Sequence, residues 1–179
     1  RSAQVQDPLG RTIRSRFSLS GKDAIVEMAA ASGLKLLRPE ERDPERTTTF
    51  GTGQLLRAAF EAGARRVLLG VGGSATVDGG EGALRALGDP RLCRRITVLC
   101  DVDTRFLDAP RVFGPQKGAS PAAVKRLERR LRSLPHSDAP GSGAAGGLAG
   151  GLAAHGARLV PGARVILELE VAVDRGSSL

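Results

Sequence analysis

The sequence predicts an α/β fold with a mixed β-sheet and flanking helices. Short apolar segments typical of buried strands alternate with segments whose apolar residues recur at helical spacing. An alternating segment near the start indicates a β-hairpin, which adds antiparallel pairing to an otherwise parallel sheet. The 179 residues, 41% of them hydrophobic, suffice for one domain with its own core and argue against intrinsic disorder.

The hairpin is predicted from two neighbouring segments. In Thr12–Leu19 apolar and polar residues alternate, as they do in a half-buried strand. Gly21 and Lys22 provide a turn, and Ala24–Met28 reads as the second strand.

Two strand–helix pairs form the predicted centre. Gly53–Ala62 carries apolar residues at helical spacing and is followed by a glycine, which favours the end of a helix. Arg66–Gly70 and Arg95–Cys100 are short apolar segments of the kind buried on both faces of a parallel sheet. Between them a glycine-rich loop leads to a predicted short helix, Gly80–Leu87.

The last third of the chain predicts two helices and a strand. Ser120 is a good N-cap, and a proline follows it, so we expect a basic helix over Ala122–Ser133. Ala144–His155, rich in glycine and alanine, predicts a closely packed helix, and Arg164–Val171 predicts a final strand.

Composition narrows the classes of function. The net charge of +8 invites a nucleic-acid interpretation, but the arginines are dispersed and the 3% of aromatic residues are all Phe, which leaves no Tyr or Trp platforms for stacking bases. Cys93 and Cys100 lack metal-site spacing and suggest a reducing, cytoplasmic compartment. No run of about eighteen apolar residues occurs. We therefore expect neither a nucleic-acid nor a membrane partner.

The loop between Leu69 and Gly82 is the most distinctive segment. Its glycines allow the backbone to approach an anion, so we expect the backbone of Gly72, Gly73, Ser74 and Ala75, with the hydroxyls of Ser74 and Thr76, to hold a phosphate or a carboxylate. Asp78 is a candidate catalytic base or Mg²⁺ ligand. The loop lacks the lysine of a Walker A motif and the acidic residue of a dinucleotide site. A tight structural turn is the alternative.

Two further segments could contribute charged groups. Asp101 and Asp103 follow a predicted strand, where alternation would place both carboxylates on one side, so Asp101 is a second candidate catalytic acid or Mg²⁺ ligand. Lys117, in a turn rich in glycine and proline, is a candidate clamp for phosphate or carboxylate. Solvated loop acids and an exposed lysine are the respective alternatives.

Six separated segments together resemble the class I glycerate kinases, the bacterial enzymes that phosphorylate D-glycerate with ATP. The segments follow the family's order, and they are Ile25–Leu34, Thr49–Gly53, the loop Gly70–Gly80, Cys100–Val102, Val112–Ala119 and Gly143–Gly147. The resemblance as a whole runs from about Val5 to Val171.

The resemblance implies ATP-dependent phosphorylation of D-glycerate, at the 2-hydroxyl, with ATP, Mg²⁺ and D-glycerate as ligands. Asp78 and Asp101 would then be catalytic, and Gly72–Thr76 with Lys117 would bind phosphate or substrate. The alternative from the residues alone is a non-catalytic basic module that binds anions or nucleic acid. The oligomeric state has no signal in the sequence.

The sequence also departs from that family. Its members are about twice as long and form a flavodoxin-like domain from both chain ends, with an inserted domain that resembles restriction-endonuclease topology. We expect residues 1–179 to be this inserted domain, with the flavodoxin-like domain largely absent and the piece alone inactive. The family has longer connections at Gly88–Asp89 and Pro135–His136, so we expect either that loops are omitted there or that this protein is shortened at these points. Thr104 and Arg105 replace the family's usual Asn-Pro.

Overall fold

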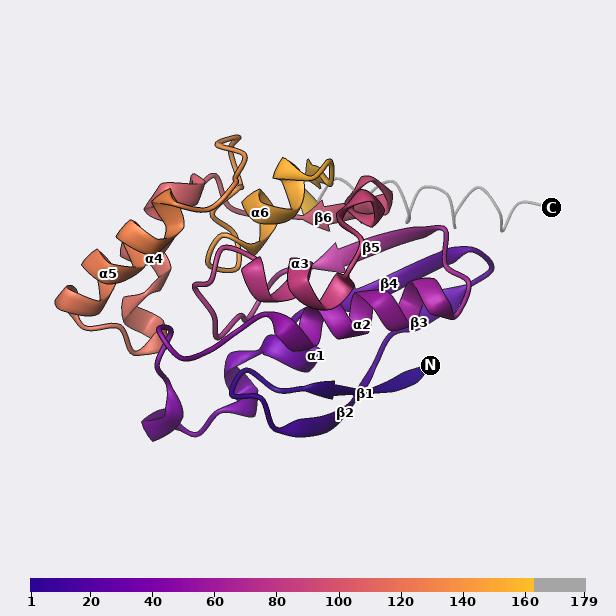
Figure 1. Cartoon of the computed structure of the whole chain (residues 1–179), viewed down its shortest axis with the longest axis horizontal. Coiled ribbons are helices and arrows are strands. Elements are labelled where there is room, and N and C mark those ends of the chain that lie inside the picture. Colours follow the sequence, from indigo (N-terminus) through magenta and orange to yellow (C-terminus); the bar gives the residue numbers. More distant parts are fainter. Residues whose placement is uncertain (163–179) are drawn as a thin grey trace, which may run out of the picture.

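A five-stranded mixed β-sheet forms the centre of the molecule, which we describe for residues 1–162 from a computed structural model (Figure 1). The strands and helices are β1 (Ser2–Gln6), β2 (Thr12–Arg16), β3 (Ser18–Ser20), β4 (Asp23–Glu27), α1 (Ala29–Ser32), α2 (Phe50–Glu61), β5 (Arg66–Gly70), α3 (Glu81–Leu87), β6 (Ile96–Leu99), α4 (Ala109–Phe113), α5 (Pro121–Arg132), α6 (Leu148–Ala154) and β7 (Arg158–Val160).

The sheet confirms the predicted mixed α/β class. Its strand order is β3-β4-β5-β6-β7, in which β3 pairs antiparallel with β4 and the other pairs are parallel. Because β4, β5 and β6 run in the same direction, their carboxyl ends meet at one edge, where α/β proteins commonly bind ligands. The predicted central strands and the hairpin are therefore present.

The single strand predicted over Thr12–Leu19 is wrong in one respect. The structure divides it at Phe17 into β2 and β3, and β2 pairs with β1 in a separate two-stranded sheet. The polar sequence of β1 gave no strand signal, so a partner for β2 was not expected. Phe17 itself is buried and joins the main core.

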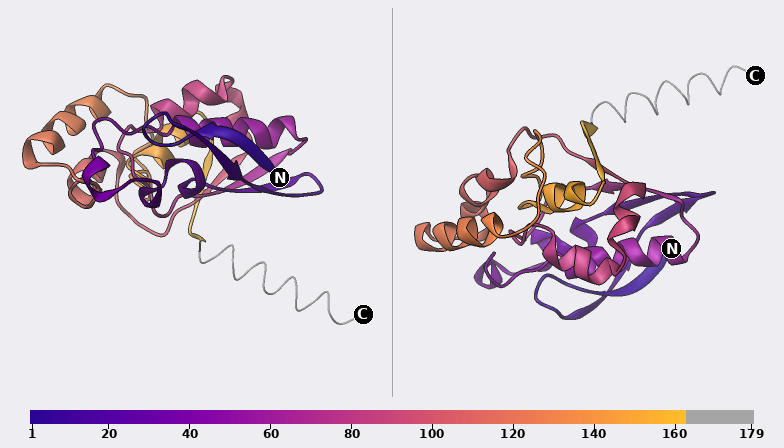
Figure 2. Two further views of the ribbon diagram at one scale, coloured as in Figure 1. Left: turned by 90° about the horizontal axis from the view of Figure 1, so that it is seen from below. Right: turned by 45° about the horizontal axis from the view of Figure 1, so that its top comes forward.

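Helices α2, α3 and α6 pack on one face of the sheet (Figures 1 and 2). Alternate strand residues such as Val26, Val67 and Val98 point into this core and are fully buried. Strand residues of the opposite parity point away from it, and Ile25 on that opposite face is 45% exposed. Within residues 1–162 helices thus cover one face of the sheet. The expectation that Arg66–Gly70 and Arg95–Cys100 are buried on both faces is wrong, because their alternate residues are only partly buried.

A second, smaller core lies beneath α4 and α5. It is built around Phe106, Leu127 and Leu131, and Val77 from the glycine-rich loop completes it. Val71 at the start of the same loop belongs to the main core. The loop is therefore fixed at both ends by burial in two different clusters.

The predicted helix boundaries are mostly confirmed. Ser120 caps α5 by accepting a hydrogen bond from the backbone N–H of Ala123 at 3.2 Å, and Gly88 follows α3 with a φ of 81°. Helix α2 begins at Phe50, three residues before the predicted start.

The helix predicted over Ala144–His155 begins only at Leu148. Ala145, Gly146 and Gly147 have positive φ angles of 55°, 69° and 91°, which a right-handed helix does not allow. The strand predicted over Arg164–Val171 lies outside the described residues. Strand β7 was not predicted, because its three residues are too few to show a period. No helix in residues 1–162 is long and apolar enough to cross a membrane.

Candidate functional site

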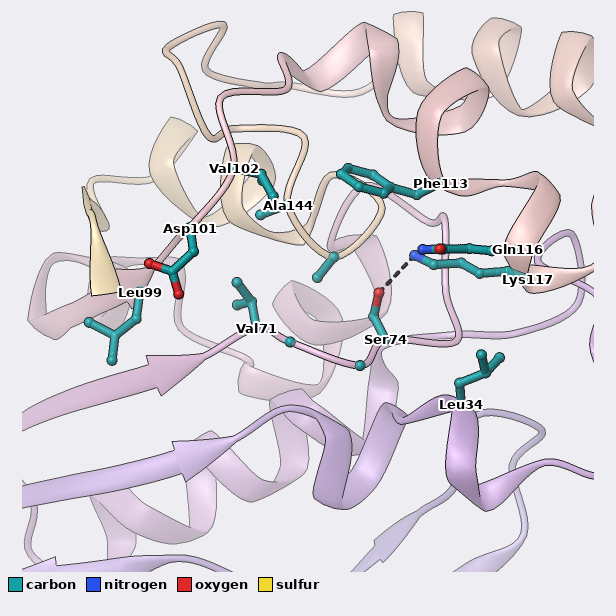
Figure 3. Close-up of a pocket in the computed structure, with 13 residues that line it drawn as sticks. Leu34, Val71, Ser74, Leu99, Asp101, Val102, Phe113, Gln116, Lys117 and Ala144 are labelled. Carbon is teal, nitrogen blue, oxygen red and sulfur yellow. Dashed lines mark hydrogen bonds between the residues drawn. The ribbon is translucent and has the colours of Figure 1, made fainter. Parts of the chain in front are cut away.

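A pocket of about 400 Å³ opens at the edge of the sheet where β5 and β6 end (Figure 3). Its walls come from three loops, one helix end and the turn before α6. The residues that line it are Leu34, Val71, Gly72, Gly73, Ser74, Leu99, Asp101, Val102, Phe113, Gln116, Lys117, Ala144 and Ala145. The structure thus brings Gly72, Gly73, Ser74, Asp101 and Lys117, all predicted from the sequence, to one place.

The glycine-rich loop is tied to the end of α1 and to the segment that follows it by backbone hydrogen bonds. The N–H of Leu34 donates to the carbonyl of Gly73 at 2.8 Å, and the N–H of Ala75 donates to the carbonyl of Ser32 at 2.9 Å. Thr47 adds a hydroxyl hydrogen bond to the carbonyl of Ala75 at 2.9 Å. These contacts fix the shape of the loop beside the pocket.

Three successive N–H groups of this loop remain available. Among the described residues, the backbone N–H groups of Gly72, Gly73 and Ser74 have no hydrogen-bond acceptor. Consecutive free N–H groups in a turn form a concave site that attracts anions. Gly73 has a φ of 70°, which explains why glycine is needed at this point of the turn.

Lys117 is a buried cation at the base of the pocket. Its Nζ donates to Ser74 Oγ at 2.7 Å and to the carbonyl of Thr76 at 2.8 Å, and it lies 5.7 Å from the centre of the Phe113 ring. The side chain is 1% exposed, and burial lowers its pKa from 10.5 to about 7, partly opposed by the charge of Asp78. The alternative of a merely solvent-exposed lysine is therefore wrong.

Asp101 lies on the opposite side of the pocket from Lys117 (Figure 3). Its Oδ1 accepts a hydrogen bond from the N–H of Gly162 at 2.8 Å. Asp103, expected on the same side, is not among the lining residues. Strand β6 ends at Leu99, so the strand alternation that would have aligned the two carboxylates does not extend to them.

Asp78 lies next to the pocket but does not line it. It is fully buried, and its carboxylate accepts five hydrogen bonds at 2.8–3.3 Å from the backbone N–H groups of Thr49, Gly80 and Gly82 and the hydroxyls of Thr48 and Thr49. This arrangement joins the glycine-rich loop to the start of α2. The catalytic role expected of Asp78 stays a prediction, and its geometry favours a positioning role.

Two other predicted residues are also turned away from the pocket. Thr76 is fully buried, and its Oγ1 has no hydrogen-bond partner among the described residues. The N–H of Ala75 is used by Ser32. Their predicted phosphate contacts stay predictions, and in this geometry Thr76 contributes its carbonyl to Lys117 instead.

The apolar wall of the pocket was not singled out from the sequence. Leu34, Val71, Phe113 and Ala144 form much of it, together with Ala145. Ala145 is the one residue other than glycine with a positive φ in residues 1–162. Backbone strain of this kind often occurs at functional sites. The sequence around Ala145 gives no sign that its φ is positive. The signal that could have found these residues is their position next to glycines in the motifs already recognised.

The arrangement suits a small anion. Free N–H groups, a serine hydroxyl and a buried ammonium lie on one side, and a carboxylate lies on the other. Within residues 1–162, no three His, Cys, Asp or Glu side chains gather into a metal site. A divalent cation here would therefore need ligands from the substrate as well as from Asp101, which is how Mg²⁺ is commonly held.

Comparison with known proteins shows which family this chain resembles. The family model described as the glycerate kinase family matches residues 1–93 and 89–175. The glycerate kinase of Haemophilus influenzae is 39% identical over 217 residues, which cover 96% of this chain and 56% of that protein. The glycerate 2-kinase of Escherichia coli is 39% identical over 213 residues, covering 93% of this chain and 56% of that protein.

A solved structure agrees with these matches. The crystal structure of a candidate glycerate kinase 2 from Salmonella typhimurium LT2 superposes with a TM-score of 0.83 at 36% identity, covering 93% of this chain and 57% of that one. The chain thus spans about half the length of the curated relatives it matches. Since the family model covers nearly all of its residues, the chain belongs to the glycerate kinase family.

Proposed function

We propose that this chain supplies half of the active site of an ATP-dependent kinase that phosphorylates D-glycerate, at its 2-hydroxyl. The observation that carries the proposal is the pocket at the carboxyl edge of the sheet, which Ser74, the free N–H groups and Lys117 line on one side. The relatives named as glycerate kinases, at 39% identity, support the choice of substrate.

The pocket offers two kinds of contact to such a substrate. The N–H groups of Gly72 and Gly73 and the hydroxyl of Ser74 would bind the carboxylate of glycerate or a phosphate of ATP. Lys117 would supply positive charge at the same place. The apolar wall that includes Val71 and Phe113 would exclude water once the pocket is closed, which would strengthen these electrostatic contacts. Transfer of a phosphoryl group depends mainly on such positioning and charge neutralisation.

In this proposal the two acids have different roles. Asp101 borders the pocket, and its carboxylate is the protein oxygen ligand that would hold Mg²⁺ together with the phosphates of ATP. Mg²⁺ would neutralise charge on those phosphates. Asp78, expected from the resemblance to act as base or Mg²⁺ ligand, is proposed as a positioning residue, because its five hydrogen bonds leave it committed to the loop.

We also propose that residues 1–179 correspond to the inserted domain of a two-domain kinase, and that this chain alone does not turn over substrate. In this proposal the second domain completes the pocket at the carboxyl edge of the sheet. The family model matches in two ranges that overlap at 89–93, next to the expected break at Gly88–Asp89. The alignment with the Haemophilus protein runs over 217 positions, more than the 179 residues of this chain, which supports longer connections in the relatives.

The basic surface does not favour nucleic acid as the alternative ligand. Arg126 and Arg130 on α5 form ion pairs with Glu45 and Glu81 at 2.7 and 2.8 Å. Part of the densest basic run in the sequence is therefore neutralised within the chain. The expected absence of a nucleic-acid partner stays a prediction. The expected cytoplasmic location fits two cysteines that are buried and unpaired.

The test is transfer of labelled phosphate from [γ-³²P]ATP to D-glycerate by the full-length gene product. We expect labelled phosphoglycerate, with the phosphate at the 2-position by ¹³C–³¹P coupling in NMR spectra. The isolated 179-residue chain, assayed in parallel, should form none. Absence of transfer by the full-length product, across a range of glycerate concentrations and with Mg²⁺ present, would reject the proposal. Salt-dependent micromolar binding to duplex DNA or to RNA, measured on the same sample, would favour the alternative instead.

A further inference from the structure

Ser74 and Lys117 form a closely coupled pair at the base of the pocket. Lys117 Nζ lies 2.7 Å from Ser74 Oγ, and its other acceptor is the carbonyl of Thr76 at 2.8 Å. The lysine is 1% exposed, whereas Ser74 lies in the wall with 9% of its surface exposed. A ligand in the pocket therefore meets the lysine mainly through the serine hydroxyl (Figure 3).

The protonation state of Lys117 can set the direction in which the Ser74 hydroxyl points. A charged ammonium has only donors, so Ser74 Oγ accepts from it and the serine proton is free to donate into the pocket. A neutral amine keeps a lone pair, so the Ser74 hydroxyl can turn inward and donate to Nζ while an amine N–H still reaches Thr76. Ser74 would then offer only lone pairs to the pocket, which suits a hydrogen-bond donor and repels an anion.

The groups around Lys117 leave both states accessible. Within residues 1–162, no carboxylate is hydrogen-bonded to its Nζ, and the Phe113 ring lies 5.7 Å away. Asp78 acts from further off and favours the charged form, while burial favours the neutral form. Asp101 on the far side of the pocket is the other acid that faces this space.

We propose that Ser74 and Lys117 form a proton-coupled receptor for an anionic oxygen, in which binding of a carboxylate or phosphate oxygen to the Ser74 hydroxyl draws a proton onto Lys117. The inference deepens the proposed function and rests on it for the choice of anion. Lys117 is a positioning residue in this scheme, since it acts on the ligand through Ser74.

The proposal has a direct consequence for binding. Each anion bound above neutral pH brings up to one proton with it. Binding should therefore weaken by up to about tenfold for each pH unit above the pKa of Lys117, which is about 7 in the free chain. A neutral ligand of similar size should show no such dependence.

The first experiment is an NMR titration of the lysine side chains, labelled with ¹³C and ¹⁵N, in the 179-residue chain. There are only four lysines, Lys22, Lys35, Lys117 and Lys125, so the signals can be assigned by single substitution. Sulfate serves as the tetrahedral probe, because it does not titrate between pH 6 and 9, and D-glycerate serves as the carboxylate probe. We expect Lys117 to titrate far below the other three and its pKa to rise by about one unit or more with either probe.

Variants distinguish proton-coupled binding from a Ser74–Lys117 hydrogen bond that only stabilises the fold. Ser74→Ala should weaken binding of the responding probe by roughly tenfold at pH 6.5 and flatten its pH dependence, and Ser74→Thr should restore both. Lys117→Met should bind weakly at every pH. Lys125→Met removes a lysine on α5, outside the pocket, and is the matched control that should behave as the unchanged chain.

Three results would overturn the proposal. The first is a pKa of Lys117 equal to that of the other lysines. The second is a pKa of Lys117 that neither probe shifts. The third is that Ser74→Ala binds the probe with unchanged affinity and pH dependence while only its thermal stability falls. A response to sulfate alone, to D-glycerate alone or to both supports it and identifies the oxygen that is recognised. These measurements need no turnover. The binding proposal can therefore fail while the kinase proposal stands, and the kinase proposal can fail while the binding proposal stands.

Discussion

Asp78 accepts two hydrogen bonds from Thr49, one from the backbone N–H and one from the hydroxyl, each at 2.8 Å. Thr49 stands at the start of α2, and the carboxylate is the acceptor for its backbone N–H, one of the groups that have no partner within the helix. The hydroxyl of Thr49 in turn accepts from the N–H of Ala83 in α3 at 2.9 Å. One buried acid therefore fixes the glycine-rich loop against two helices.

Replacing Asp78 should destabilise the fold as well as the pocket. In Asp78→Asn an amide NH₂ would face donors that now meet a carboxylate oxygen, so we expect the free energy of unfolding to fall by about 2–4 kcal/mol in urea titrations. Asp108→Asn is the control, because Asp108 pairs with Arg111 at the surface and should cost less than about 1 kcal/mol. Equal losses in the two variants would remove the positioning role assigned to Asp78.

The turn before α6 should tolerate no side chain at Gly146. A Cβ there would lie 2.0 Å from the carbonyl oxygen of Thr76, and the φ of Gly146 is 69°. Gly146→Ala should therefore cost about 3 kcal/mol or more by chemical denaturation. Gly10→Ala isolates the backbone contribution, since Gly10 also has a positive φ of 88° but nothing within 4 Å of its Cβ, and it should cost only about 1 kcal/mol. A loss at Gly146 no larger than that at Gly10 would contradict this packing.

Stability should rise with pH just above neutrality because of Lys117. Its pKa is 10.5 in the ordinary state and about 7 when folded, so between these values the unfolded chain binds more protons than the folded one. The free energy of unfolding should then increase toward a slope of about 1.4 kcal/mol per pH unit, whereas below about pH 7 this group adds no pH dependence. Urea titrations between pH 7 and 8.5 measure this effect.

The comparison that isolates this effect is Lys117→Met, which should lose the rise. The upper pH limit excludes Cys93 and Cys100, whose pKa values burial raises from 9.0 to about 11 and whose contribution to stability therefore falls at higher pH. An identical slope in the variant and in the unchanged chain would show that Lys117 is charged at neutral pH in the folded state.

Both cysteines should resist alkylation. Cys93 and Cys100 are buried, and desolvation raises the pKa of each thiol to about 11, so little thiolate exists at pH 7.5. Iodoacetamide should modify them at less than about a tenth of the rate seen in urea, where two labels per chain are expected by mass spectrometry. Rapid labelling of the folded chain would mean that the adjoining sheet edge opens.

The sequence predicted those parts of the fold that are determined by residues close together in the chain. Arg66–Gly70 and the helix capped by Ser120 were found because an apolar run and a cap are local signals. Strand β1 and the division at Phe17 were missed, because pairing with a distant, polar strand leaves no local mark. The start of α6 was misplaced because alanine favours a helix, yet Ala145 is held at a positive φ by the turn's contacts with the glycine-rich loop.

The same distinction applies to the site. Residue type singled out Ser74, Asp101 and Lys117 as separate candidates, and the resemblance joined them in one site; the structure brings them to one pocket, because glycine-rich loops and strand ends converge in α/β folds. Spacing could not show that Lys117 is buried or that the carboxylate of Asp78 is fully occupied. Both depend on side chains that meet only in three dimensions, such as Thr49 with Asp78 and Thr76 with Lys117.

The most direct test of the account is phosphoryl transfer by the full-length gene product carrying Ser74→Ala, compared with Ser133→Ala. Both changes remove a serine hydroxyl, but Ser133 lies at the exposed end of α5, outside the pocket. With [γ-³²P]ATP and D-glycerate varied from below to above its KM, Ser74→Ala should lose roughly 100-fold in kcat/KM while Ser133→Ala keeps the activity of the unchanged protein. Equal activity of the two variants, or no transfer to glycerate by the unchanged protein, would contradict the account.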